Sequence, residues 1–153
     1  MLFFLGIRYG TTHLKVDGQD IRFSLVDVLD SNFSEWYANL DRDKLIYPGM
    51  MGGIHFVDVG RNDCLENVKS SVEELIKKSE VPNIPIIVIG DRSVNEANAR
   101  LVKNYLTRFN NVHFMDISNL NIFHVLAKLY LERIRHTNPY HEGNRTGSLE
   151  SLF

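Results

Sequence analysis

A run of branched apolar residues near the middle of the chain, Ile84-Pro85-Ile86-Ile87-Val88-Ile89, constrains the fold more than any other feature. Its side chains are apolar on both alternating faces, which is typical of a central parallel strand covered by helices on both sides. Pro85 cannot donate to a sheet ladder, so we expect it near the start of this strand. Parallel neighbours need long crossover connections, usually helical ones. The run therefore predicts an α/β architecture.

The flanking segments fit such an architecture. Residues 53–59 read as a buried strand, and residues 112–117 as a further one. From 62 to 79 the apolar residues recur at helical spacing. Ser93 and Glu96 form a capping-box pattern that predicts the start of a second helix, which continues through Ala97, Leu101, Tyr105 and Phe109. Residues 121–135 predict a last helix with basic residues in its final turns, where the helix dipole favours them.

A β-hairpin is predicted near the start of the chain. In residues 11–16 and 21–28, apolar and polar residues alternate with a period of two. Asp17-Gly18 lies between these runs and is a typical hairpin turn. We expect Thr12, Leu14 and Val16 to share one face with opposing apolar residues of the second strand. The fold class is therefore α/β, with a mostly parallel sheet and one antiparallel hairpin.

One domain accounts for the pattern. We expect residues 1–136 to form it, and residues 137–153, which are rich in Asn, Gly, Ser and Pro, to form a C-terminal tail. The formal net charge of −2 argues against a generic nucleic-acid binder, which is usually clearly basic. No run approaches the ~20 apolar residues of a membrane span, and the single Cys64 suits a reducing compartment. These features predict a cytoplasmic or nuclear location.

Three strings occur in order along the chain. The first is Phe56-Val57-Asp58-Val59 followed by Asn67-Val68, the second is the strand at 83–90, and the third is the segment at 111–118, which ends in Asp-Ile-Ser. In type and spacing they make the chain resemble a small GTPase of the Ras superfamily, nearest to its Ran and Rab branches, over about residues 11–135. The resemblance implies a small-GTPase-like α/β fold.

The motifs that bind nucleotide in this family depart from its pattern here. The sequence holds no Gly-Lys-Ser/Thr, the end of the phosphate-binding P-loop. The Asp-Thr-Ala-Gly segment that senses the γ-phosphate corresponds to residues 27–30, where Asp27 is kept and Asp30 replaces the glycine. The guanine-reading Asn-Lys-x-Asp corresponds to residues 91–94. Asp91 stands at its first position, and Val94 replaces the last carboxylate. The final Ser-Ala-Lys keeps Ser118 and lacks its lysine. We expect no binding of GTP or GDP, no cofactor and no catalytic residue.

The short segment before the hairpin predicts a deletion. Residues 2–6 are expected to supply the strand between the hairpin and the rest of the sheet, with residues 7–10 as the connection. The phosphate loop, the first helix and the first switch of the family would then be missing. Loss of that helix would leave an apolar sheet face, which monomers rarely expose. We expect the tail or a partner to cover it.

Other polar residues carry weaker signals. Asp27, Asp30, Asp58 and Asp116 are either a carboxylate cluster for a metal or, as we favour, residues that cap turns. The histidines show no ligand spacing, so no metal site is predicted. Cys64, at the start of a helix, is expected to be a buried structural thiol rather than a nucleophile.

A set of aromatic residues and methionines occupies the position of the family's second switch and suits a partner-binding surface. The set comprises Phe33, Trp36, Tyr37, Tyr47, Met50 and Met51. The alternative is that these side chains pack onto the sheet. No C-terminal cysteine is present for prenylation, so no membrane anchor is predicted.

These features predict a non-catalytic pseudoGTPase that acts as a protein–protein interaction or assembly module, such as a mimic of Ran- or Rab-like proteins. Two alternatives remain open. One is an atypical nucleotide-binding protein with a rearranged site formed by Asp27, Asp91 and Ser118. The other is a structural protein that self-associates through its bare face.

Overall fold

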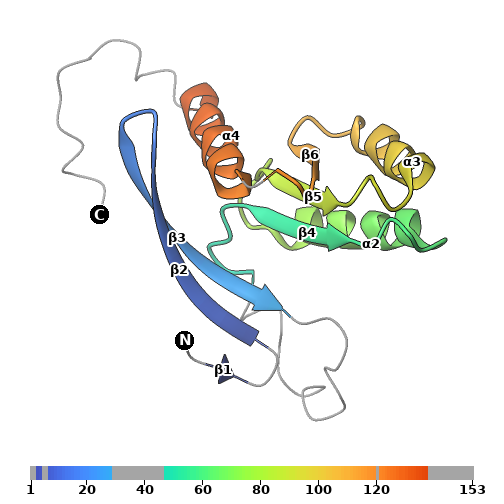
Figure 1. The fold of residues 1–153 in the computed structure, drawn as a ribbon. Helices are drawn as coiled ribbons and strands as arrows, with labels where there is room; N and C mark the ends of the chain where they lie inside the picture. The colour runs from blue at the N-terminus through green and yellow to red at the C-terminus, as the bar shows by residue number, and fades with distance from the viewer. Residues whose placement is uncertain (1–2, 5–6, 29–46, 120, 138–153) are drawn as a thin grey trace.

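The computed structural model describes residues 3–4, 7–28, 47–119 and 121–137, which form six strands and three helices (Figure 1). Their bounds are β1 Phe3–Phe4, β2 Ile7–Val16, β3 Gln19–Val28, β4 Gly53–Val57, α2 Cys64–Lys78, β5 Ile86–Gly90, α3 Glu96–Leu106, β6 Val112–Asp116 and α4 Ile122–Thr137. The α/β fold class is confirmed. The predicted tail lies outside the described residues, apart from the last residue of α4.

The apolar run at the centre of the sequence forms the central strand of a parallel sheet, as predicted. The strand order is β4-β5-β6, and β5 pairs with a parallel neighbour on each side. All five residues of β5 are buried. Pro85 immediately precedes the strand, where its carbonyl oxygen accepts from the Gly53 amide at 2.9 Å.

Two helices cover one face of this sheet. Val68 and Val72 of α2 and Val102 of α3 are fully buried in one cluster with Ile86 and Val88 of the central strand. Burying a Val or Ile side chain contributes about 1.5–3 kcal/mol. The predicted helix at 62–79 is thus confirmed, two residues shorter at its start and one at its end.

The predicted capping box is wrong. Helix α3 begins at Glu96 with Asn95 as its N-cap, whose side-chain oxygen accepts from the Asn98 amide at 3.1 Å. The Ser93 side chain is already bonded to Asp91 at 2.5 Å. Of the apolar residues that were expected along this helix, Tyr105 is buried and Leu101 is exposed, and the buried residues of α3 are Ala99, Val102, Tyr105 and Leu106.

The hairpin forms as predicted and is longer. β2 and β3 pair without interruption over ten residues each. Asp17 and Gly18 make a two-residue turn with φ of 50° and 82°, the positive values of a type I′ turn. The alternation holds, since Thr12, Leu14 and Val16 lie on the inner face and their polar neighbours are exposed.

The expected central position of residues 2–6 is wrong. Phe3–Phe4 pairs antiparallel with the start of β2, so the hairpin belongs to a separate three-stranded sheet of order β1-β2-β3. The physical reason is that β2 already begins at Ile7. Only two residues separate it from β1, and such a short link returns the chain onto the adjacent strand.

Helix α4 joins the two sheets (Figure 1). Leu126 and Ala127 are buried, and Leu126 packs in a cluster with Ile87 and Ile89 of β5. The ring of Phe123 lies 5.5 Å from that of Phe23 on β3. Near the other end of the helix, Arg135 pairs with Asp17 of the hairpin turn at 3.8 Å. None of the described helices is long and apolar enough to cross a membrane.

We expect Phe23 and Phe123 to couple the hairpin energetically to α4. The single variants Phe23→Leu and Phe123→Leu and the double variant form a double-mutant cycle, with stability measured by urea unfolding. An aromatic pair adds about 0.5–1.5 kcal/mol beyond its buried area, so the cycle should give about 1 kcal/mol of coupling. Strict additivity of the two losses would contradict this docking contact.

Candidate functional site

The carboxyl ends of β4, β5 and β6 meet at one edge of the parallel sheet. Open α/β sheets bind their ligands at this edge. An aspartate lies at each strand end, Asp58 after β4, Asp91 after β5 and Asp116 at the last position of β6. Asp116 is directly in register with Gly90, the residue before Asp91.

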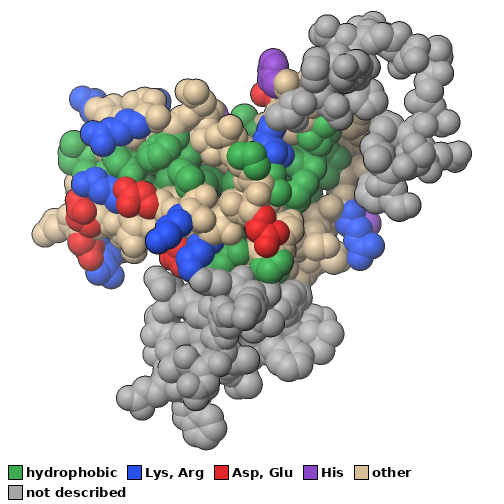
Figure 2. Space-filling view, turned by 180° about the vertical axis from the view of Figure 1, so that it is seen from behind, with side chains coloured by type: hydrophobic (Ala, Val, Ile, Leu, Met, Phe, Trp, Pro, Cys, Tyr) green, Lys and Arg blue, Asp and Glu red, His purple; other side chains and the backbone are tan. Residues whose placement is uncertain are grey.

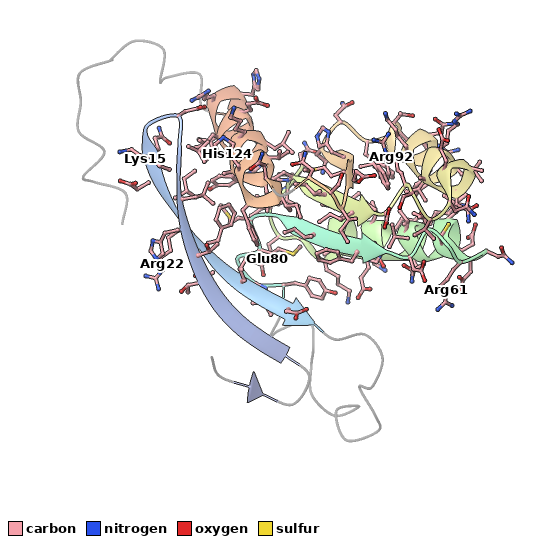
Figure 3. The ribbon with its side chains drawn as sticks, in the orientation of Figure 1. Lys15, Arg22, Arg61, Glu80, Arg92 and His124 are labelled. Atoms are coloured by element: carbon pink, nitrogen blue, oxygen red, sulfur yellow. The ribbon has the colours of Figure 1, made fainter. Side chains whose placement is uncertain are left out.

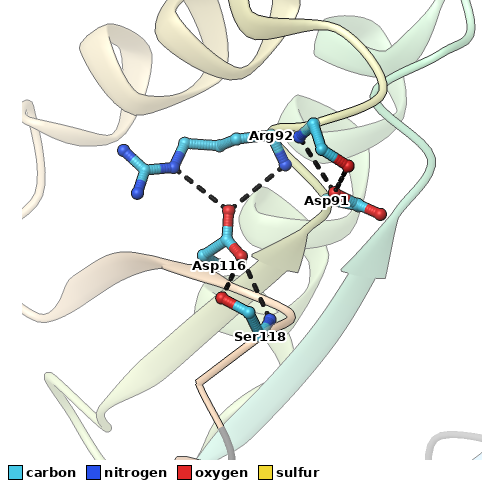
Figure 4. A network of polar contacts seen from close by, with 5 residues as sticks. Asp91, Arg92, Asp116 and Ser118 are labelled. Atoms are coloured by element: carbon cyan, nitrogen blue, oxygen red, sulfur yellow. Dashed lines mark hydrogen bonds and ion pairs between the residues drawn. The ribbon is translucent and has the colours of Figure 1, made fainter.

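The Asp116 carboxylate organises the loops after β5 and β6 (Figure 4). Its Oδ1 accepts from the amide of Ser118 at 3.0 Å and from the Ser118 hydroxyl at 2.6 Å. Its Oδ2 accepts from the backbone amide of Arg92 at 3.3 Å and from Arg92 Nε at 3.1 Å. Both carboxylate oxygens are therefore engaged by the protein itself.

This arrangement favours the ionised form of Asp116. Hydrogen bonds from Ser118, and then those from Arg92, hold the pKa of the Asp116 carboxyl well below its usual range. A carboxyl with such a depressed pKa does not carry a proton near neutral pH. It is therefore unsuited to general acid catalysis.

The other two aspartates close their own turns. Asp91 Oδ1 accepts from the amide of Ser93 at 2.9 Å and from its hydroxyl. Asp58 Oδ1 accepts from the amide of Gly60 at 2.9 Å. These are Asx-type contacts two residues along the chain. The favoured interpretation of Asp58 and Asp116 as residues that cap turns is thus confirmed.

An open hollow of about 320 Å³ lies beside this network. It is lined by Arg92, Ser93, Glu96 and Asp116. Two carboxylates and one guanidinium give it mixed charge. Val94, in the loop after β5, is 59% exposed and lies over Gly60, where an added Cβ would meet Val94 Cγ1 at 3.0 Å.

In the described part of the chain, no hydrogen bond joins Asp91 to Ser118, two residues of the alternative rearranged site. Asp91 and Ser118 lie in neighbouring loops, and each bonds a different partner within them. Asp27 lies near the end of β3 in the other sheet. Asp30 falls outside the described residues.

No group of three or more metal-ligating side chains occurs in the part of the chain that the structure describes. His55 of β4 contacts the Oδ1 atom of Asn67 on α2 through its Nε2 atom at 3.0 Å. Cys64 is buried, and this burial raises the pKa of its thiol. The predicted structural role of Cys64 is confirmed by that burial, because an inert thiol needs neither exposure nor a lowered pKa.

Three of the six candidate contact residues can be placed. Tyr47 is buried, and its hydroxyl donates to Glu74 Oε1 of α2 at 2.8 Å. Met50 is half-buried against the same core, whereas Met51 is 45% exposed. Tyr47 is therefore buried and bonded to α2, so its side chain is not part of an exposed surface among the described residues. Phe33, Trp36 and Tyr37 lie outside the described residues.

Sequence reasoning missed Phe56, the most exposed large apolar residue in the described part of the chain. Phe56 of β4 is 64% exposed and lies on the same face as Ile54, which packs with α4. Ile117, just after β6, is 48% exposed. Figure 2, which shows the molecule from behind, has hydrophobic side chains in a band among basic and acidic ones. Phe56 lies in an edge strand of the parallel sheet. Hydrophobic periodicity alone does not reveal which strand lies at an edge.

Arg92 was also missed as a site residue. Its side chain extends from the loop after β5 toward the end of β6 (Figure 3). In the described part of the chain it forms an ion pair between these two loops, with Asp116 at 3.1 Å. The sequence placed Arg92 beside Asp91 and gave no sign of a contact 24 positions away.

No protein-family model matches the chain. Among curated proteins, Ras-related protein RIC2 of Oryza sativa subsp. japonica is 28% identical over 89 residues. These residues are 58% of this chain and 38% of that protein, so the match spans little more than a third of the relative's length. Together with the α/β fold, the similarity supports a relationship to the Ras superfamily.

We expect Asp116→Asn to lower stability in a pH-dependent way. The folded-state pKa of Asp116 lies below the unfolded value of about 3.9. Its stabilising contribution is therefore complete above that value and is lost as the pH falls toward the folded pKa. Urea unfolding at several pH values should show the largest difference between wild type and variant near neutral pH and a shrinking one below about pH 4.

The matched control for this experiment is Glu96→Gln. Glu96 lines the same hollow and forms an ion pair with the exposed Arg100 at 3.6 Å. This substitution should leave stability nearly unchanged, because exposed pairs contribute little. A loss in Asp116→Asn that stayed constant across the pH range would contradict the role of the ionised carboxylate.

Proposed function

We propose that the chain is a GTPase-like domain that does not bind guanine nucleotide and acts as a protein-binding module. The observation that carries this proposal is the state of the loops after β5 and β6. Their carboxylates are bonded to residues of these two loops, and Val94 stands where the resemblance requires the carboxylate that reads guanine.

The base-binding side of the site lacks its specific donors and acceptors. A site that hydrogen-bonds a polar ligand loses much of its selectivity when one partner is absent. Here the guanine carboxylate is replaced by Val94, and Ser118 is followed by Asn119 and Leu120 in place of the Ala-Lys pair. Two of the groups that hold the base in Ras-like proteins are thus missing together.

The phosphate-binding side of the site also lacks the groups that bind nucleotide in Ras-like proteins. The sequence contains no Gly-Lys-Ser/Thr, the motif that supplies a lysine for the phosphates and a hydroxyl for Mg²⁺. Asp30 replaces a glycine of the γ-phosphate sensor, and a carboxylate there repels a phosphate. Both halves of a nucleotide therefore lose binding energy.

A protein-binding role is supported by the surface that remains. Only α4 among the described helices packs on the face of the parallel sheet that carries Ile54, Ile87 and Ile89. Phe56 on this face is largely exposed, and aromatic residues are frequent anchors of protein interfaces. Mimicry of a Ran- or Rab-like protein, with a partner seated on this side, is one form of the role.

The first test is isothermal titration of the chain with GTP and with GDP, each with and without Mg²⁺. We expect no affinity tighter than about 1 mM, because neither the base nor the phosphates meet their usual partners. A micromolar dissociation constant for either nucleotide would overturn the proposal and favour the atypical nucleotide-binding alternative.

The second test addresses the contact surface. Phe56→Ser should abolish specific capture of a protein partner in a pull-down, since it removes the exposed ring. Leu101→Ser on α3 is the matched control, because Leu101 is also apolar and is 53% exposed. It should leave capture intact. Equal loss in both variants, with both still folded by circular dichroism, would exclude Phe56 as the anchor.

A further inference from the structure

We draw no further inference here: the strongest candidate, the exposed apolar side chains of Phe56 and Ile117 at the carboxyl ends of the edge strands β4 and β6, belongs to the surface that the proposed function already uses, and nothing in the described part of the chain shows what covers it.

Discussion

The packing of α4 between two separate sheets is the interaction on which the rest of the structure depends. Within the described residues, no strand of the hairpin pairs with a strand of the parallel sheet, so strand pairing does not hold these two parts together. α4 instead contacts β5 through Leu126 and β3 through Phe123. A helix that serves two partners must be apolar over much of its circumference, which explains why the sequence of α4 is less clearly amphipathic than that of α2.

In the loops at the carboxyl ends of the parallel strands, polar groups form hydrogen bonds with one another. In an open α/β sheet the carboxyl ends of the strands present backbone amides and aspartates toward solvent, where a ligand can use them. Here the same groups bond one another, as Asp116 does with Ser118 and Arg92. Internal contacts therefore hold the loops after β5 and β6 in place. These internal hydrogen bonds, together with Val94, support the proposal that the domain does not bind guanine nucleotide.

The sequence predicted those elements whose periodicity reflects burial on one face. Both strands of the hairpin alternate as the solvent boundary requires, and the apolar residues of α2 recur at helical spacing, so both were foreseen. Contacts that depend on competition between neighbouring residues were not predicted. Ser93 and Asn95 are both good N-caps, and Asp91 decides between them by taking the Ser93 hydroxyl.

Arrangements that depend on chain geometry or on packing between distant residues could not be predicted from the sequence either. The position of β1 follows from where β2 starts, and no periodic pattern encodes that limit. Tyr47 and Met51 are both large and apolar, yet one packs against α2 while the other is exposed. Composition treats them alike, because only the path of the chain separates them.

The distance in sequence between the hairpin and its docking helix has a consequence for synthesis. The ring of Phe123 that receives Phe23 lies about 100 positions later in the chain. At ~5–20 residues per second, a ribosome needs roughly 5–20 s to reach it. A hairpin closed by an Asp-Gly turn forms in microseconds. During that interval its apolar face has no helix to rest on, and neighbouring nascent chains on the same messenger would meet with this face uncovered.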